Sequence, residues 1–186
     1  MNFFLKITSK PNYPFFFSDT NSLNGSLIAI GKYISSPPST PLLYEDSGNS
    51  NLDIKSLQNY DVLETVGGGW VISERFKILL ETNFEDEVQL FPTLINYKNE
   101  NIKNYFAINI YNKIECYDLE KSVYTKHPVD QSYDFTKKVL KTNPLEEYGM
   151  EYNIVRNIFD NQIVVSEFFK EIFTKNDINS LKFTKK

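Results

Sequence analysis

The sequence of 186 residues contains one cysteine, Cys116, and one histidine, His127. A single cysteine cannot form an intramolecular disulfide, which fits a reducing compartment. One histidine, one cysteine and scattered carboxylates also provide none of the ligand spacings of zinc sites. Cys116 and His127 could form a nucleophile–base pair, but Cys116 stands in an apolar segment where a buried, inert thiol is the default. We therefore predict no metal, no cofactor and no catalytic residue.

Excess basic charge and long apolar runs are absent as well. Lys and Arg number 20 against 24 Asp and Glu, so the net charge is −4. Nucleic-acid-binding proteins usually carry a basic face, so this balance argues against such a partner. No apolar stretch approaches membrane-spanning length, and Pro11 and Pro14 interrupt an N-terminal segment that lacks the basic start of a signal peptide. The expectation is a cytoplasmic protein that binds neither nucleic acid nor membrane.

What the chain does contain is material for a hydrophobic core. Hydrophobic residues make up 41% of it, and the aromatic residues are mostly Phe (15) and Tyr (12). This length suffices to bury a core without disulfides or metals, and aromatic residues favour strands. We predict an α+β fold, with a mainly antiparallel sheet and a few packed helices, in a single domain spanning residues 1–186.

One stretch of ten residues occurs twice in similar form, as "VISERFKILL" at 71–80 and "VVSEFFKEIF" at 164–173. In both copies a strand-like segment precedes Ser-Glu, and apolar residues then recur at the spacing of one buried helical stripe. A polar break and another strand follow each copy. The chain therefore contains a duplicated strand, Ser-Glu, helix, strand unit. We expect its helices to pack on the sheet through Phe76, Leu79, Leu80, Phe169, Ile172 and Phe173.

The serines of the repeat, Ser73 and Ser166, could be nucleophiles or helix caps. A serine at the N-cap accepts a hydrogen bond from a free N–H of the first turn, and Glu74 and Glu167 would interact favourably with the helix dipole. A nucleophile needs a base. The chain has one histidine for two serines, and neither serine has the flanking glycines of the G-x-S-x-G nucleophile elbow. We predict two capped helices.

Three consecutive glycines, Gly67, Gly68 and Gly69, precede Trp70 and could cradle a phosphate. They lack the downstream Gly-Lys-Ser/Thr of a P-loop and the spacing of a dinucleotide-binding fingerprint. A turn that needs positive φ is the expected use. A small intracellular enzyme or ligand-binding domain that uses the Gly67–Gly69 loop is the alternative function, and a scaffold subunit with an apolar self-interface is a third.

Local patterns predict the remaining elements. Pro92 interrupts an apolar strand at 87–95, which indicates an edge strand or a bulge. We expect surface loops over most of 18–51 and an irregular region with one strand within 122–150. The other expectations are strands at 3–7, 61–66 and 104–119, a short helix at 53–60, a hairpin turning at Asp160-Asn161 and a last strand at 178–183.

Acidic residues gather in two places. One group is Glu81, Glu85, Asp86 and Glu87, at the turn after the first repeated helix, and the other is Glu115, Asp118 and Glu120. Charge runs usually form a solvated surface. As a functional alternative, these carboxylates would form a docking surface for a basic protein partner, where such charges raise the association rate and specificity.

Several short motifs follow one another along the chain: Trp70 to Arg75, Phe91-Pro92, Tyr105 with Asn109, Asp118 with Ser122, Ile158-Phe159 and Val164 to Glu167. In this order they resemble the myxobacterial-type immunity proteins of bacterial polymorphic-toxin systems, a family formerly known as a domain of unknown function. The resemblance covers about residues 61–184, and residues 1–60 correspond to a part that varies within the family. Asp160 departs from the pattern, because the family often has arginine directly after the phenylalanine.

The resemblance implies a protein without catalytic activity that binds a cognate toxin in the cytoplasm of the producing cell and blocks it. The acidic net charge is compatible with masking a basic, nucleic-acid-cleaving toxin. The residues that would maintain the family's structural motif are Trp70, Ser73, Glu74, Pro92, Asp118, Ser122, Ser166 and Glu167.

Overall fold

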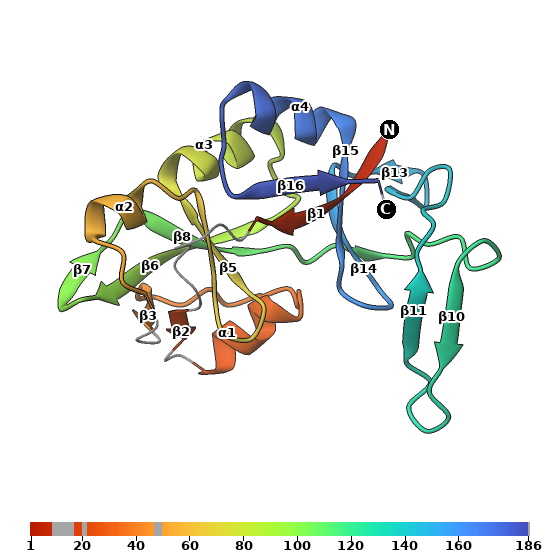
Figure 1. Cartoon of the computed structure of the whole chain (residues 1–186), viewed down its shortest axis with the longest axis horizontal. Helices are drawn as coiled ribbons and strands as arrows, with labels where there is room; N and C mark the ends of the chain where they lie inside the picture. Colours follow the sequence, from red (N-terminus) through yellow and green to blue (C-terminus); the bar gives the residue numbers. More distant parts are fainter. Residues whose placement is uncertain (9–16, 20–21, 47–49, 186) are drawn as a thin grey trace.

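The structure is a computed structural model that describes residues 1–8, 17–19, 22–46 and 50–185; Pro11 and Pro14 lie outside these ranges. Most strands belong to two sheets, and two helices lie together over them (Figure 1). The predicted α+β class is confirmed. The strands are divided between two main sheets, however, where the sequence suggested one.

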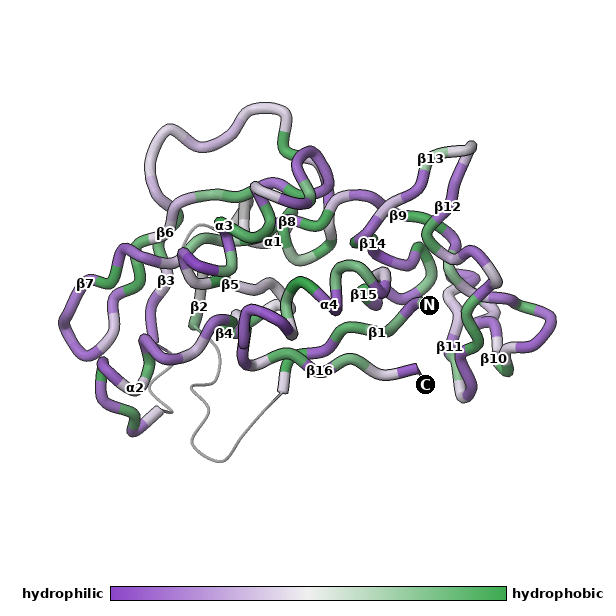
Figure 2. Tube along the Cα trace, turned by 90° about the horizontal axis from the view of Figure 1, so that it is seen from above, coloured by the Kyte–Doolittle hydropathy of each residue, from purple (hydrophilic) through white to green (hydrophobic). Residues whose placement is uncertain are grey.

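The smaller of the two main sheets has five strands and contains both ends of the chain. Its order is β16 (Leu181–Thr184), β1 (Asn2–Ile7), β15 (Ile163–Ser166), β14 (Ile154–Asn157) and β9 (Lys113–Ile114). All neighbours are antiparallel except β14 and β9. The strand predicted at 3–7 is confirmed as β1, and Figure 2 shows it beside β16 with the two termini at one end. The N-terminal strand is thus an inner strand of this sheet.

The larger sheet has seven strands. Its order is β2 (Phe17–Asp19), β3 (Leu42–Asp46), β6 (Gln89–Tyr97), β8 (Tyr105–Asn109), β5 (Trp70–Ser73) and β4 (Val62–Glu64), and β7 (Glu100–Ile102) pairs with β6. Only β3 and β6 run parallel among the paired strands of this sheet that the structure describes.

Four helices and two hairpins complete the described elements. The helices are α1 (Ser22–Ala29), α2 (Ile54–Gln58), α3 (Glu74–Asn83) and α4 (Glu167–Lys175). One hairpin, β10 (Val123–Lys126) with β11 (Tyr133–Lys137), projects from the body of the molecule in Figure 1. The other is the short pair β12 (Glu146–Glu147) and β13 (Met150–Glu151).

The duplicated unit is larger than the sequence predicted. Copy 1, as we call it, consists of β4, β5, α3, β6 and β8, and its strands lie in the order β6-β8-β5-β4. Copy 2 consists of β14, β15, α4, β16 and β1, in the order β16-β1-β15-β14. All strand pairs within both sets are antiparallel. Copy 2 is a circular permutation of copy 1, because β1, from the N-terminal end of the chain, takes the place that β8 has in copy 1.

The same junction of hydrogen bonds begins each copy. Asp61 immediately precedes β4, its carbonyl accepts a hydrogen bond from Ser73 N, and its carboxylate accepts one from Ser73 Oγ at 2.6 Å. Asn153 immediately precedes β14, and its carbonyl and side-chain oxygen accept from Ser166 N and Oγ, the latter at 2.8 Å. Each serine therefore connects its helix to the residue that immediately precedes the hairpin of the same copy.

The two copies are also connected crosswise. Asn179, four residues beyond α4, donates from its backbone N to the Asp61 carboxylate at 2.8 Å. Glu87, four residues beyond α3, accepts hydrogen bonds from the backbone N and the side-chain amide of Asn153, at 2.6 and 2.8 Å. In each case a residue of the loop after one copy's helix binds the residue that precedes the first strand of the other copy. Each of these pairs consists of one carboxylate and one amide.

The helices of the two copies pack on the sheets through their apolar stripes, as predicted, and they also share one hydrophobic core. Phe76 of α3 and Phe173 of α4 are buried, and their ring centroids lie 4.5 Å apart. Phe84, at the end of α3, lies against Phe169 at 5.1 Å. Residues of both sheets close this core from below, including Ile72 of β5 and Val165 of β15. Full burial of one such side chain contributes about 1.5–3 kcal/mol, so this interface holds the copies together.

The outer face of each sheet is covered by a different part of the chain. In copy 1, α1, α2 and β3 contribute Ile28, Leu57 and Leu42 to a second core beneath the larger sheet. In copy 2, the segment that follows β9 contributes Tyr117 and Leu145 to a third core beneath the smaller sheet. The repeated unit is therefore a common scaffold with two unlike covers.

The irregularity predicted at Pro92 is confirmed, although β6 is an inner strand of the larger sheet. β8 pairs with residues 89–92 and β3 begins to pair at residue 93, so Pro92 has a paired strand on one side only. Pro92 pairs with Phe106 and Ile95 with Ile102, so the three residues between Ile102 and Phe106 lie opposite two residues of β6, which is a bulge.

Other expectations about local structure are wrong. The single strand expected at 104–119 is divided into β8 and β9, which belong to different sheets. Regions 18–51 and 122–150 contain more regular structure than expected, namely α1, β3 and the two hairpins.

Candidate functional site

The repeated serines act as helix caps. Ser73 Oγ accepts a hydrogen bond from Phe76 N at 3.4 Å, and Ser166 Oγ accepts one from Phe169 N at 3.0 Å. Both serines have the extended backbone of an N-cap. Because each hydroxyl donates its own proton to Asp61 or Asn153, it is fully used in the junction. Glu74 and Glu167 occupy the first turns, where a carboxylate stabilises the helix dipole.

The residues that carry the family resemblance elsewhere are also held by structural contacts. Trp70 is half-buried against the core shared by the two helices. Ser122 is buried and its hydroxyl accepts from Val139 N at 3.0 Å. The Asp118 carbonyl accepts from Ser122 N, and the Asp118 carboxylate pairs with Lys121 at 2.6 Å, which holds the pKa of this carboxyl below its usual value. Asp118 and Ser122 thus form a turn attached to residue 139.

Asp160, where the chain departs from the family pattern, makes its own network. Its carboxylate accepts from Tyr117 Oη at 2.8 Å and Asn157 Nδ2 at 2.9 Å, and pairs with Lys138 at 2.7 Å. Burial alone would raise its pKa, but the hydrogen bonds from Lys138, Asn157 and Tyr117 outweigh burial and the pKa is lowered. The predicted hairpin turn is confirmed, and Asn161 provides the positive φ of 56°.

The triple glycine is the turn of the β4–β5 hairpin. Gly67 and Gly68 have φ of 101° and 87°, and a Cβ added at either would meet nothing within 4 Å. Thr65 N donates to the carbonyl of Gly69, which closes the turn. A strand follows the glycines, so no helix N-terminus is aligned with them as it is in a phosphate-binding loop. The expected turn with positive φ is confirmed.

Cys116 and His127 do not form a catalytic pair. The Cys116 thiol is fully buried, and burial raises its pKa to about 12. His127 is exposed on the β10–β11 hairpin, where Nδ1 lies 3.1 Å from the Asp130 carboxylate. Within residues 1–8, 17–19, 22–46 and 50–185, no cluster of three or more His, Cys, Asp or Glu side chains could hold a metal ion.

In the first acidic group, residues 81–87, only some of the carboxylates are without a partner among the described residues. Glu81 pairs with Lys77 at 2.6 Å, and Glu87 is used at the junction with Asn153. Glu85 and Asp86 are exposed, and they lie with Glu81 around a depression of about 380 Å³ at the end of α3.

The second acidic group is similarly engaged. Glu115 pairs with Lys141 at 3.0 Å and Asp118 with Lys121, which leaves Glu120 exposed. Among the residues that the structure describes, no hydrogen bond or ion pair joins the two acidic groups.

Arg156 is a buried cation in β14. Its side chain is 5% exposed, Nε donates to the Ile110 carbonyl at 2.9 Å, and Nη2 donates to the Ile28 carbonyl at 3.3 Å. Desolvation lowers its pKa to about 10. Gly31, with φ of 66°, packs so closely that a Cβ would lie 2.5 Å from Arg156 Cδ. This contact ties copy 2 to α1, and an arginine placed among Ile154, Val155, Ile158 and Phe159 was the only sequence signal for it.

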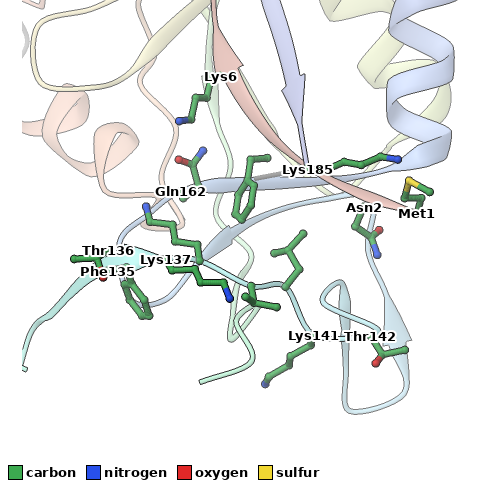
Figure 3. A pocket seen from close by; sticks show the side chains of 14 residues that line it. Met1, Asn2, Lys6, Phe135, Thr136, Lys137, Lys141, Thr142, Gln162 and Lys185 are labelled. Carbon is green, nitrogen blue, oxygen red and sulfur yellow. The ribbon is translucent and has the colours of Figure 1, made fainter. Parts of the chain in front are cut away.

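A large cavity lies on the outer side of copy 2. It has a volume of about 880 Å³ and is lined by one side of β1 and by residues 135–142 (Figure 3). Five lysines line it, and no aspartate or glutamate does: Lys6, Lys137, Lys138, Lys141 and Lys185. Sequence reasoning missed this site because its lysines come from three distant segments of an acidic protein.

The described helices include none that is long and apolar enough to cross a membrane. What the fold defines is a scaffold of two capped, permuted copies whose potentially reactive side chains are engaged in packing and hydrogen bonds. Residues 28–186 match the model of the Immunity protein family (Imm11), so the chain belongs to that family. The match confirms the resemblance and extends it on the N-terminal side of residue 61. None of the curated proteins matches the chain.

Proposed function

We propose that this protein neutralises a cognate bacterial toxin by stoichiometric binding in the cytoplasm of the producing cell, without catalysis. The observation that carries the proposal is the family match over residues 28–186, since an immunity protein implies a toxin as partner. The proposal takes residues 1–186 as one domain, because β1 lies between β15 and β16.

The geometry supports binding over catalysis. Ser73 and Ser166 cap helices, Cys116 is buried with a raised pKa, and Gly67–Gly69 form a hairpin turn. An activated nucleophile needs an available base or a lowered pKa. The carboxylate beside Ser73, that of Asp61, is already paired with Arg75, and the pKa of Cys116 is raised. The alternative of an enzyme or ligand-binding domain at Gly67–Gly69 gains no support from this turn.

Of the acidic residues predicted to contact the toxin, the exposed and unpaired carboxylates are the best candidates. Glu85, Asp86 and Glu120 are exposed and make no ion pair with another described residue. In the proposal they contact a basic part of the toxin, where rim charges chiefly raise the association rate. Glu81, Glu115 and Asp118 would first have to exchange their lysine partners.

The test is co-expression with the protein encoded in the neighbouring reading frame, read out as restored growth and as a one-to-one complex after purification. Failure of the folded wild-type protein to bind that product or to restore growth would contradict the proposal. The acidic contacts are tested separately with Glu85→Lys/Glu120→Lys. Its matched control is Glu100→Lys/Asp134→Lys, which changes the net charge equally at exposed positions elsewhere. A smaller association rate for the first variant alone supports those contacts.

A further inference from the structure

The cavity on copy 2 is an open groove with two opposed sides. Lys6 lies on the side of the five-stranded sheet, and Lys137 and Lys141 lie on the opposite side (Figure 3). Side chains alternate along a strand, so Asn2, Phe4 and Lys6 of β1 face the groove together while Phe3 and Leu5 face the helices. We name this site the lysine groove.

The positive charge of the lysine groove is partly uncompensated. Lys138 pairs with Asp160 and Lys141 with Glu115, at 2.7 and 3.0 Å. Lys6 and Lys137 are exposed and pair with no carboxylate among the described residues. Lys185 lines one end of the groove, but its ammonium lies 6.0 Å from the centroid of the Phe3 ring, on the face of β1 that is turned to the helices. A cluster of like charges in a cleft raises the local concentration of ligands of opposite charge. This cluster stands out because the protein as a whole has a net charge of −4.

The floor of the groove is apolar. The residues that line it between the lysines of the two sides are Phe4, Phe135, Val139 and Leu140. Its side along β1, from Met1 to Lys6, measures about 17–20 Å at a rise of about 3.3 Å per residue. This length suits about five residues of an extended peptide, with apolar side chains on the floor and acidic side chains toward the rims.

We propose that the lysine groove binds an extended acidic segment of the partner protein, with carboxylates of that segment paired to Lys6 and Lys137. This inference rests on the proposed function and assigns a surface and a charge to it. Lysines on the two sides of an apolar floor fit spaced carboxylates of one chain better than one compact anion. Nucleic acid is disfavoured because a long polyanion would also meet the acidic remainder of the surface, whereas a short segment feels mainly charges within about 8 Å.

A binding measurement without toxin tests the groove directly. The probe is a short peptide of alternating glutamate and phenylalanine, followed by fluorescence anisotropy at low and physiological salt. We expect wild-type protein to bind it and Lys6→Glu/Lys137→Glu to bind at least about tenfold more weakly, since like charges at an interface oppose binding. The matched control is Lys32→Glu/Lys55→Glu, which reverses two exposed lysines elsewhere and should retain wild-type affinity.

Two competitors exclude other ligands. If inorganic phosphate displaces the peptide at equal molar concentration, the groove is a small-anion site and the proposal is wrong. If a single-stranded oligonucleotide binds more tightly than the peptide and loses affinity in the groove variant alone, the partner is nucleic acid and the proposal is likewise wrong. Equal peptide binding by the groove and control variants would also overturn it. Thermal unfolding of each variant is measured first, and Lys6→Gln/Lys137→Gln replaces a groove variant that does not fold.

Co-expression with the product of the neighbouring reading frame separates this inference from the proposed function. Wild-type protein that neither binds nor protects counts against the function itself. Wild-type and control proteins that protect, with a groove variant that is folded but no longer protects, support the groove. Protection by all three proteins contradicts the groove and leaves toxin binding in place.

Discussion

Copy 1 and copy 2 share a hairpin, a capped helix and two further strands, yet they differ at the junction and on the outer face. At the junction, copy 1 uses a carboxylate, Asp61, where copy 2 uses an amide, Asn153. On the outer face, copy 1 is covered by helices α1 and α2, whereas copy 2 is covered by a segment that leaves the lysine groove open. The comparison indicates that the shared parts maintain the fold and that the unlike covers are free to carry binding.

The largest effect is expected at the contact between the two helices. Phe76→Ala and Phe173→Ala each remove a buried ring and should lower the free energy of unfolding by about 3–5 kcal/mol. Because the rings touch, the double variant should cost less than the two single variants added together. Denaturant unfolding measures all three. Strict additivity would show that the copies are not coupled through this contact.

The second prediction concerns the junction, where Asn153→Asp gives copy 2 the carboxylate that copy 1 has at Asp61. Asn153→Asp places a second carboxylate against Glu87, whose Oε1 now accepts from Asn153 Nδ2 at 2.8 Å. We expect a loss of about 2 kcal/mol at neutral pH from the lost hydrogen bond and the repulsion. The repulsion raises the folded-state pKa of the carboxyl pair, so the loss relative to wild type should shrink as the pH falls.

Two further variants sharpen that prediction. Glu87→Gln added to Asn153→Asp restores one carboxylate and one amide, and should recover much of the stability. Asp61→Asn should also cost about 2 kcal/mol, because an amide NH2 group cannot accept the hydrogen bond that the carboxylate accepts from Asn179 N at 2.8 Å and the ion pair with Arg75 is lost. Unchanged stability of Asp61→Asn would show that the charge at the junction does not matter.

Asp160 has no equivalent in copy 1 and should make copy 2 the acid-sensitive half. Its folded pKa lies below the ordinary value of 3.8, so its stabilisation is complete above that value and is lost as the pH falls through the lowered pKa. We expect Asp160→Asn to lower the free energy of unfolding by about 1.5 kcal/mol at pH 7, as for a hydrogen-bonded charge. Unfolding at pH 7 and in acid checks this, and a difference from wild type that persists unchanged in acid would contradict it.

The smallest effect is expected for the caps. Ser73→Ala and Ser166→Ala should each lower stability by about 1 kcal/mol through loss of the N-cap hydrogen bond. Thermal unfolding measures the loss, and toxin binding should persist in both variants. Unchanged melting combined with abolished protection would mean that the serine has a functional role.

Several local features could be predicted from the sequence. The Ser-Glu caps, the apolar stripes ending in Leu80 and Phe173, the positive-φ glycine turn and the hairpin at Asn161 all follow from interactions within a few residues. The family resemblance was also predicted, because its motifs include the same capped junctions. Pro92 indicated an edge or a bulge, and it lies where β6 pairs on one side only, next to a bulge in the segment that joins β7 and β8.

The candidate site was the part that the sequence could not predict. Acidic residues close in sequence looked like a surface, but Glu81, Glu87, Glu115 and Asp118 are engaged by neighbouring residues. The lysine groove is assembled from β1, residues 137–141 and Lys185, which the chain separates widely.

The sequence by itself determined the two capped helices, because capping and amphipathic spacing act over one or two turns. Only the tertiary structure decided that the second copy is permuted, with β1 completing its sheet, and that Asn179 and Glu87 cross between the copies. It also decided where the uncompensated positive charge gathers. Strand partners, crossed hydrogen bonds and charge clusters depend on residues that are close in space and distant along the chain, so no local pattern specifies them.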